Sequence, residues 1–347
     1  MPELLLMAAA CFCVWYTQSG FPREIILSDT GVWDLRAVDF SQKIVRFEGK
    51  VEYIEDALLT PEEFALRADE AVIADTRYTG ARYGTSRIRL LVPEGMSCAI
   101  SENSPLGAVR IFLNGEWMED LGRPGHDAES AIPAGAFFYY TLRPRGGVIE
   151  IVQQVSNFAH RINESHAGYM IGSVGLMRSF FIRTTHMTAL VMGCFLALFF
   201  VHLTLWFMFR SYRPNLYFAF FCFVWMVRTA VVERNPFLDM FPRVLWEIPF
   251  RVNYLTVPLT IILLTLIMNM LFPESMPRIY KRVAYTTGVL FAMLSLFMDT
   301  VPLSSSLIWY EATTLALLVW YIPCLVIRLW KNRKITLPQS IYLVGVV

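Results

Sequence analysis

The pattern of hydrophobic and polar positions divides the chain into two parts. Up to about residue 177, short apolar runs alternate with polar turn residues, as in an ordinary soluble domain. From about residue 185 the apolar runs become long, and several approach the ~20 residues that a helix needs to cross a bilayer. The pattern therefore predicts a multidomain membrane protein, in which an all-β domain is followed by an α-helical transmembrane bundle.

Five complete spans are predicted in the second part, at residues 185–209, 216–232, 252–272, 283–301 and 307–329. Residues 299–306 carry no basic side chain and are predicted to be a loop between the last two spans. A sixth apolar run begins at residue 341, but the printed sequence ends at residue 347, too soon for a crossing. We expect the sequence to stop inside this sixth span, so that the module at 185–347 is truncated.

The first part reads as a β-sandwich or jelly roll over residues 25–177. Strands are predicted at 44–47, 50–54, 86–92, 108–113, 137–142 and 148–155, separated by turn residues. Asn114-Gly115 is a strong signal for a tight hairpin turn. Thr60-Pro61 followed by Glu62 and Glu63 predicts the start of a short helix, with a capping box at its first turn. Residues 176–184 are predicted to be a short link to the first span.

Two features of the sequence indicate how the chain is oriented in the membrane. Residues 4–16 are apolar but too short to span, so residues 1–20 are interpreted as a signal peptide, with an uncleaved anchor as the alternative. Basic side chains gather after the first, third and fifth spans and are scarce in the other loops, which places those ends in the cytoplasm. We predict a multi-pass protein of a bacterial inner membrane with its N-terminal domain outside the cytoplasm.

Composition agrees with a membrane location and excludes some partners. Only 17% of the residues are charged and 55% are hydrophobic, with a mean hydropathy of +0.46, whereas soluble domains have about 25% charged residues. The net charge of +1 gives no indication of a nucleic-acid partner. Cys98 is the single cysteine of the predicted β domain, so an internal disulfide is not expected there.

Charged side chains inside spans are costly and therefore informative. Arg228 and Glu311 lie near the outer ends of the second and fifth spans, where they form a candidate intramembrane pair. The alternative, given equal weight, is that each reaches the outer interface alone. His202, in the first span, is interpreted as a packed polar contact in preference to a proton relay.

The sequence contains none of the common catalytic signatures, so we expect no enzymatic activity in this chain, no cofactor and no metal. His126 and Glu129 lie in a segment rich in metal-capable side chains, but a solvated loop is favoured there. The densest polar run follows the strand at 148–155, where side chains suited to bonding sugar hydroxyls could combine with an aromatic ring for stacking. For Asn157 alone, capping of a turn is the preferred interpretation. The candidate ligand-binding residues are Trp117, Asn157, Phe158, His160, Arg161 and His166.

A series of weak motifs in a fixed order carries a family resemblance. The segments begin at Gly31, Gly49, Tyr83, Val109, Glu150 and Tyr212, and together with the topology they cover residues 25–347. The chain resembles the bacterial seven-transmembrane receptors with diverse intracellular signalling modules. This resemblance implies an extracytoplasmic jelly roll similar to carbohydrate-binding modules, and a cytoplasmic kinase, cyclase or phosphatase after the seventh span. Val51 departs from the family pattern, which often has an aromatic residue at this position.

We therefore expect the sensory part of a receptor, which binds a small molecule or carbohydrate outside and relays a signal through the lipid bilayer. The alternatives are a membrane-anchored glycan-binding protein without signalling output and, less favoured, a transporter. No nucleic-acid partner is expected, and a homodimer is left open as the assembly.

Overall fold

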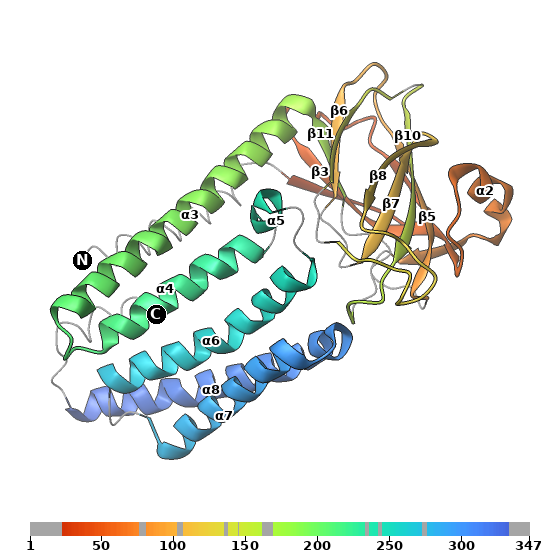
Figure 1. Ribbon diagram of the computed structural model, residues 1–347. Coiled ribbons are helices and arrows are strands. Elements are labelled where there is room, and N and C mark those ends of the chain that lie inside the picture. Colours follow the sequence, from red (N-terminus) through yellow and green to blue (C-terminus); the bar gives the residue numbers. More distant parts are fainter. Residues whose placement is uncertain are drawn as a thin grey trace. The chain divides into compact units, whose positions relative to one another are not determined.

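The computed structural model describes residues 23–75, 81–102, 107–134, 138–144, 146–161, 169–232, 236–241, 245–272 and 276–332. The chain forms two compact units, one comprising Gln18–Thr184 and the other the residues from Thr185 onward. The first unit is a β-sandwich and the second is helical (Figure 1). The signal peptide predicted at residues 1–20, the run at 341–347 and His166 all lie outside the described residues.

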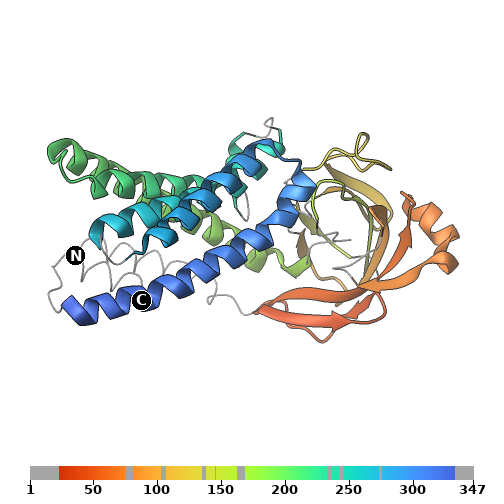
Figure 2. The same cartoon turned by 90° about the horizontal axis from the view of Figure 1, so that it is seen from below.

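The sandwich has two sheets. Sheet A consists of β1 (Arg23–Ser28), the first half of β3 (Ile44–Glu55), β11 (Tyr169–Ser173), β6 (Cys98–Glu102) and β9 (Phe138–Leu142). Sheet B consists of the second half of β3, β2 (Val32–Asp34), β4 (Val72–Asp75), β5 (Tyr83–Leu91), β10 (Val148–Ser156), β7 (Ala108–Leu113) and β8 (Glu116–Leu121). Figure 2 shows the strands curving around a common interior.

Strand β3 belongs to both sheets. The sequence predicted two strands at 44–47 and 50–54, but Ile44–Glu55 is one strand. Gly49 takes a φ of 127° at the middle of it, and a Cβ there would lie 2.1 Å from the carbonyl oxygen of Ser28 on β1. Only glycine lets the two backbones approach so closely. Instead of the break that the sequence predicted between two strands, the chain passes here from one sheet to the other within a single strand.

The core lies between the two sheets. Alternate residues of each strand point inward, which gives one apolar cluster that includes Trp33, Phe47, Ile88, Ile111 and Ile151. The indole N–H of Trp33 donates to the carbonyls of Ile26 and Glu48, each at 3.1 Å. Val51, where the family pattern often has an aromatic, is fully buried in this cluster, so its side chain faces the core and not a ligand.

Two local predictions are confirmed. Asn114 and Gly115 have φ values of 50° and 83° and join β7 to β8, as a primed two-residue hairpin turn requires. Helix α2 (Pro61–Leu66) is preceded by Thr60, whose hydroxyl accepts from the backbone N–H of Glu63, while the Glu63 carboxylate accepts from the backbone N–H of Thr60. Figure 1 shows α2 on the outside of the strands, followed by the short 3₁₀ helix Ala68–Glu70.

The predicted link at 176–184 is part of a helix. Helix α3 (Val174–Met208) begins directly after β11 and is 35 residues long. Within the β-sandwich unit its first turns pack Met177 and Phe180 against Ile44, Ala99 and Met170 on the outer face of sheet A. These apolar residues stand three or four positions apart on one helix face, which is why the segment is helical and not an open connection.

The helical unit contains α4 (Pro214–Val231), the short α5 (Pro236–Met240), α6 (Glu247–Leu271), α7 (Arg278–Phe297) and α8 (Thr300–Asn332). Among the described residues, four helices are long and apolar enough to cross a membrane: Val174–Met208, Pro214–Val231, Glu247–Leu271 and Thr300–Cys324. The predicted fourth span corresponds to α7, whose first turns carry Arg278, Lys281 and Arg282.

The prediction of a loop at residues 299–306 is wrong. Helix α7 ends at Phe297, and α8 begins at Thr300, so only two residues separate them. The hydroxyls of Ser304 and Ser305 donate to the carbonyl of Val301, and that of Ser306 donates to the carbonyl of Leu303. Serine side chains can bond the preceding turn in this way, so the polar run is accommodated inside the helix.

Candidate functional site

The predicted ligand-binding residues begin in the turn after β10. Asn157 is buried, and its Oδ1 accepts from the backbone N–H groups of Ala159 (3.3 Å) and His160 (3.0 Å). Arg82 donates from Nη1 to the carbonyls of Asn157 (3.3 Å) and His160 (3.0 Å). Asn157 therefore caps the turn, the alternative preferred for this residue, and His160 is buried within the same turn. Arg161 is exposed beside it.

An aromatic cluster lies at this end of sheet B. Tyr83, the first residue of β5, meets the ring of His126 edge-on with centroids 5.1 Å apart, and stacks on Phe158 at 6.5 Å. Ser156 holds the His126 loop in place, because its hydroxyl accepts from the backbone N–H of Gly125 at 3.1 Å. His126 is exposed, and Tyr83 and Phe158 are half-buried. We call Tyr83, His126 and Phe158 the aromatic cluster.

Tyr83 and His126 were not among the predicted binding residues. They come from segments far apart in sequence from Phe158, and only the pairing of Tyr83 with Ser156 at the ends of β5 and β10 brings the three rings together. The turn signal of the Gly-Arg-Pro-Gly segment before His126 was visible in the sequence. It gave no indication of which strand end the loop would cover.

Trp117 lies elsewhere on the sheet, on the edge strand β8. Its side chain is 60% exposed, and its Nε1–H donates to Oδ1 of Asp120 at 2.9 Å. Arg110 on β7 holds the same carboxylate with two bonds of 2.7 Å. The bond from Arg110 is the main reason that the pKa of Asp120 lies below its ordinary value. The structure therefore separates Trp117 from the turn at Asn157 and fixes its orientation.

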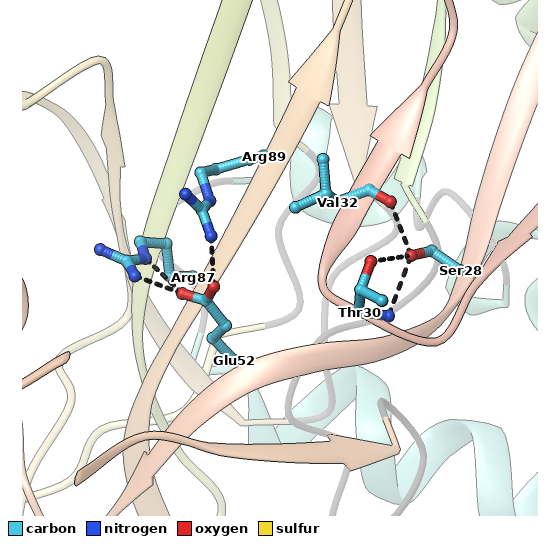
Figure 3. A network of polar contacts seen from close by, with 6 residues as sticks. All are labelled: Ser28, Thr30, Val32, Glu52, Arg87 and Arg89. Atoms are coloured by element: carbon cyan, nitrogen blue, oxygen red, sulfur yellow. Dashed lines mark hydrogen bonds and ion pairs between the residues drawn. The ribbon is translucent and has the colours of Figure 1, made fainter. Parts of the chain in front are cut away.

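A second charged network lies across β3 and β5 (Figure 3). The carboxylate of Glu52 lies between two guanidinium groups: Arg87 donates to Oε2 from Nε at 2.5 Å, and Arg89 bonds to Oε1. Glu52 and Arg87 are 12% and 14% exposed, while Arg89 is 39% exposed. The Arg87 guanidinium also lies over the ring of Phe64 in α2, 4.8 Å from its centroid. This network fastens α2 to sheet B.

The neighbouring turn between β1 and β2 is polar but local. The hydroxyl of Ser28 accepts from the backbone N–H of Thr30 at 3.2 Å and donates to the carbonyl of Val32 at 2.6 Å (Figure 3). These contacts close the turn, and we assign the turn no further role.

In the helical unit, Arg228 joins α4 to α6. Its Nη1 donates to Oδ1 of Asn253 and to Oγ1 of Thr256, both at 3.1 Å, and to the Asn253 carbonyl at 3.3 Å. The candidate ion pair with Glu311 is not among the contacts of Arg228 in the part of the chain that the structure describes. Neutral partners on the adjacent helix take its place. His202 packs against Phe218 with ring centroids 4.4 Å apart.

The described residues contain no group of His, Cys, Asp or Glu side chains arranged to hold a metal ion. In the loop after His126, Oδ1 of Asp127 accepts from the backbone N–H groups of Glu129 (3.1 Å) and Ser130 (2.7 Å). This carboxylate therefore stabilises its own loop.

Comparison with known proteins gives a family for the helical part. Residues 185–347 match the family described as 7TM diverse intracellular signalling. No curated protein matches the chain.

Solved structures of Ruminococcus gnavus β-glucuronidase give only weak similarity. The enzyme in complex with uronic isofagomine is 10% identical over 38% of this chain and 28% of its own, with a TM-score of 0.24. Its apo structure at 1.7 Å is 9% identical over 38% of this chain and 29% of its own, also with a TM-score of 0.24. This chain thus covers less than a third of that enzyme, and a similarity so low supports no shared activity.

The four apolar helices and the family match agree on a multi-pass membrane protein. Residues 185–347, the helical part of this chain, are therefore similar to the family described as 7TM diverse intracellular signalling.

Proposed function

We propose that this chain is the sensory part of a receptor, in which the β-sandwich binds a ligand outside the cytoplasm and the helices relay the signal inward. One observation carries this proposal: α3 packs its first turns on the outer face of sheet A and continues without a break into the first membrane helix. A change in sheet A is therefore felt by α3 directly, because no flexible linker intervenes to absorb it.

The ligand contacts are proposed at the aromatic cluster. Tyr83, His126 and Phe158 are partly or fully exposed rings on loops and strand ends that a rigid sandwich positions, and binding residues are concentrated in such places. Arg161, at the end of the turn that contains Phe158, is an exposed polar side chain three residues along the chain from this ring. Rings for stacking next to polar donors suit a carbohydrate, the ligand class that the family resemblance also implies.

The proposed orientation rests on the loop charges. Arg210 and Arg213 lie between α3 and α4, and Arg278, Lys281 and Arg282 lie at the start of α7. An excess of basic residues marks the cytoplasmic side of a membrane. The β-sandwich, at the other end of α3, then lies outside the cytoplasmic membrane.

The test uses the full chain in lipid nanodiscs, with a fluorophore on a cysteine introduced at Ser211 and the other cysteines replaced. A panel of soluble oligosaccharides is added while thermal stability and fluorophore emission are recorded. A ligand that raises the unfolding temperature and changes the emission supports both binding and relay. Binding without any change in emission would instead indicate a glycan-binding protein without signalling output.

Two variants sharpen the test. Phe158→Ala weakens binding without lowering the unfolding temperature of the unliganded chain, because the ring is only half-buried. A flexible Gly-Ser insertion after Thr184 preserves binding and abolishes the emission change. If the change persists despite the insertion, α3 does not act as a rigid connection and the proposed relay is wrong.

A further inference from the structure

We infer that the exposed face of α7 binds an anionic phospholipid, with Arg278 and Arg282 holding the phosphate of the headgroup and the apolar side chains beyond them lying along the acyl chains. The inference concerns the helical unit. It goes beyond the proposed function, because it does not depend on any ligand of the β-sandwich.

Helix α7 packs against the rest of the helical unit through one face only. The buried residues of this face stand three or four positions apart: Tyr280, Ala284, Gly288, Phe291 and Ser295. A Cβ at Gly288 would lie 2.7 Å from Cγ1 of Ile262 on α6, so the two helices approach closely at this point. Small residues at the contact are typical of helix pairs in membranes, which means that this face is the one adapted to a neighbouring helix.

The opposite face of α7 carries large apolar side chains and is exposed. Six of them are between 46% and 76% exposed: Ile279, Val289, Leu290, Met293, Leu296 and Phe297. At about 100° per residue, the middle of this face lies roughly 180° around the helix from the middle of the buried face. Large branched and aromatic side chains without small residues between them favour contact with lipid chains over close packing of another helix.

Arg278 and Arg282 lie on the same exposed face, at the start of the helix. They are one turn apart, so their Cβ atoms are separated by about 6 Å. Helix α7 contains no acidic residue, and neither arginine makes a hydrogen bond or ion pair in the part of the chain that the structure describes. Lys281 differs from both, because its Nζ donates to Oδ1 of Asn269 on α6 at 3.0 Å. Two uncompensated positive charges therefore remain beside the apolar face.

This combination of charge and apolar surface fits a phospholipid. A guanidinium group matches the oxygens of a phosphate with paired hydrogen bonds, and each basic residue near a membrane surface attracts anionic lipid. The apolar face continues directly from the two arginines along the helix, so that one molecule can occupy both parts. A free phosphate would use only the charged end. A zwitterionic lipid carries its own ammonium group, which reduces the attraction of its phosphate to the arginines.

The experiment measures lipid binding to the full chain in a neutral detergent by native mass spectrometry, with cardiolipin, phosphatidylglycerol and phosphatidylethanolamine titrated separately. The unaltered chain binds the two anionic lipids at least about tenfold more tightly than phosphatidylethanolamine. The double variant Arg278→Gln/Arg282→Gln weakens binding of the anionic lipids by about 30-fold, the effect expected from two interfacial charges. It leaves binding of phosphatidylethanolamine unchanged. Its unfolding temperature also stays the same, because neither arginine has a partner to lose in the part of the chain that the structure describes.

The matched control is Arg210→Gln/Arg213→Gln, which removes two charges between α3 and α4. Arg210 lies over the rings of Trp206 and Phe207, 5.8 and 5.7 Å from their centroids, and the control leaves lipid affinity within about threefold. Equal losses in the two double variants would mean that positive charge attracts lipid without a site on α7, and would overturn the inference.

Two further outcomes contradict it. Displacement of the lipid by inorganic phosphate, beyond the effect of chloride at the same ionic strength, would show that the charged end alone is recognised. Equal affinity for all three lipids would leave this face of α7 to a protein contact, either another helix or a second copy of the chain. Neither outcome affects the proposed function, which rests on the β-sandwich and α3.

Discussion

Removal of the negative charge between Arg87 and Arg89 tests whether the network at β3 and β5 stabilises the β-sandwich. In Glu52→Gln the side chain keeps its size but no longer carries the negative charge that compensates the positive charges of the two guanidinium groups. Arg87, only 14% exposed and already over the Phe64 ring, then remains as a largely desolvated charge. We expect a clear loss of stability in the sheet, because an unpaired charge in such surroundings is costly.

The size of the expected loss in stability follows from how deeply the side chains of the network are buried. Hydrogen bonds to charged groups contribute about 1.5–3 kcal/mol, and breaking a fully buried pair costs about 3–5 kcal/mol. Since Glu52 and Arg87 are not completely buried, we expect about 2–3 kcal/mol for Glu52→Gln. Arg89 is 39% exposed, so Arg89→Gln is expected to cost less than about 1 kcal/mol.

Hydrogen exchange measured by mass spectrometry on the full chain reports on this region without unfolding the helices. The amides of β3 and β5 exchange through openings of the sandwich, and a loss of 2–3 kcal/mol speeds that exchange by about 30- to 150-fold. The matched control is Asp34→Asn, which removes an equally close ion pair with Arg36 at 2.6 Å where both side chains are more than half exposed. This control leaves exchange unchanged. If Glu52→Gln speeds exchange by less than about threefold, the reasoning from burial is wrong.

Three further predictions concern other buried or intramembrane residues of the chain. Gly84→Ala destabilises the sandwich by about 1–3 kcal/mol, because the new Cβ would lie 2.2 Å from the hydroxyl oxygen of Tyr53; chemical denaturation measures the loss, and adding Tyr53→Phe recovers part of it if that clash is the cause. Burial raises the pKa of the Cys98 thiol from 9.0 to about 11, so the folded chain does not react with maleimide at Cys98 below pH 9. The stability that this neutral thiol contributes is complete below its unfolded pKa near 9 and is lost as the pH rises through about 11. Rapid labelling of Cys98 itself in the native chain at neutral pH would contradict the expected lack of reactivity. Arg228→Leu weakens the packing of α4 on α6 by about 1 kcal/mol, whereas Glu311→Gln has no effect on thermal unfolding in nanodiscs, and equal losses in the two variants would revive the predicted ion pair.

Features encoded by a few adjacent residues could be predicted from the sequence. The hairpin at Asn114-Gly115 requires two consecutive positive φ values, and the helix at Thr60 requires one hydroxyl and one carboxylate three residues apart. Each signal is complete within its own segment. The two-part architecture was equally clear, because long apolar runs have few alternatives to membrane helices.

Features that depend on distant partners could not be predicted. Gly49 has the local signature of a turn, and only the proximity of Ser28 explains why it lies inside a strand. Residues 176–184, at the start of α3, were predicted to be a short link, although Met177 and Phe180 have helical spacing that a search for amphipathic periodicity could have detected. At the candidate site, Trp117 was grouped with the turn at residue 157 by residue type alone. The strand register separates them.

The sharing of β3 between the sheets has a mechanical consequence. Its second half pairs with β5, which begins at Tyr83 in the aromatic cluster, and its first half pairs with β11, which leads into α3. A rotation of one sheet against the other therefore twists the backbone of a single strand, and the change from one sheet to the other occurs near Gly49, where β1 packs against it through Ser28. If the proposed ligand binds at the aromatic cluster, torsional stiffness near Gly49 would set how far a displacement there travels along β3 towards β11 and α3, independently of how tightly the ligand is held.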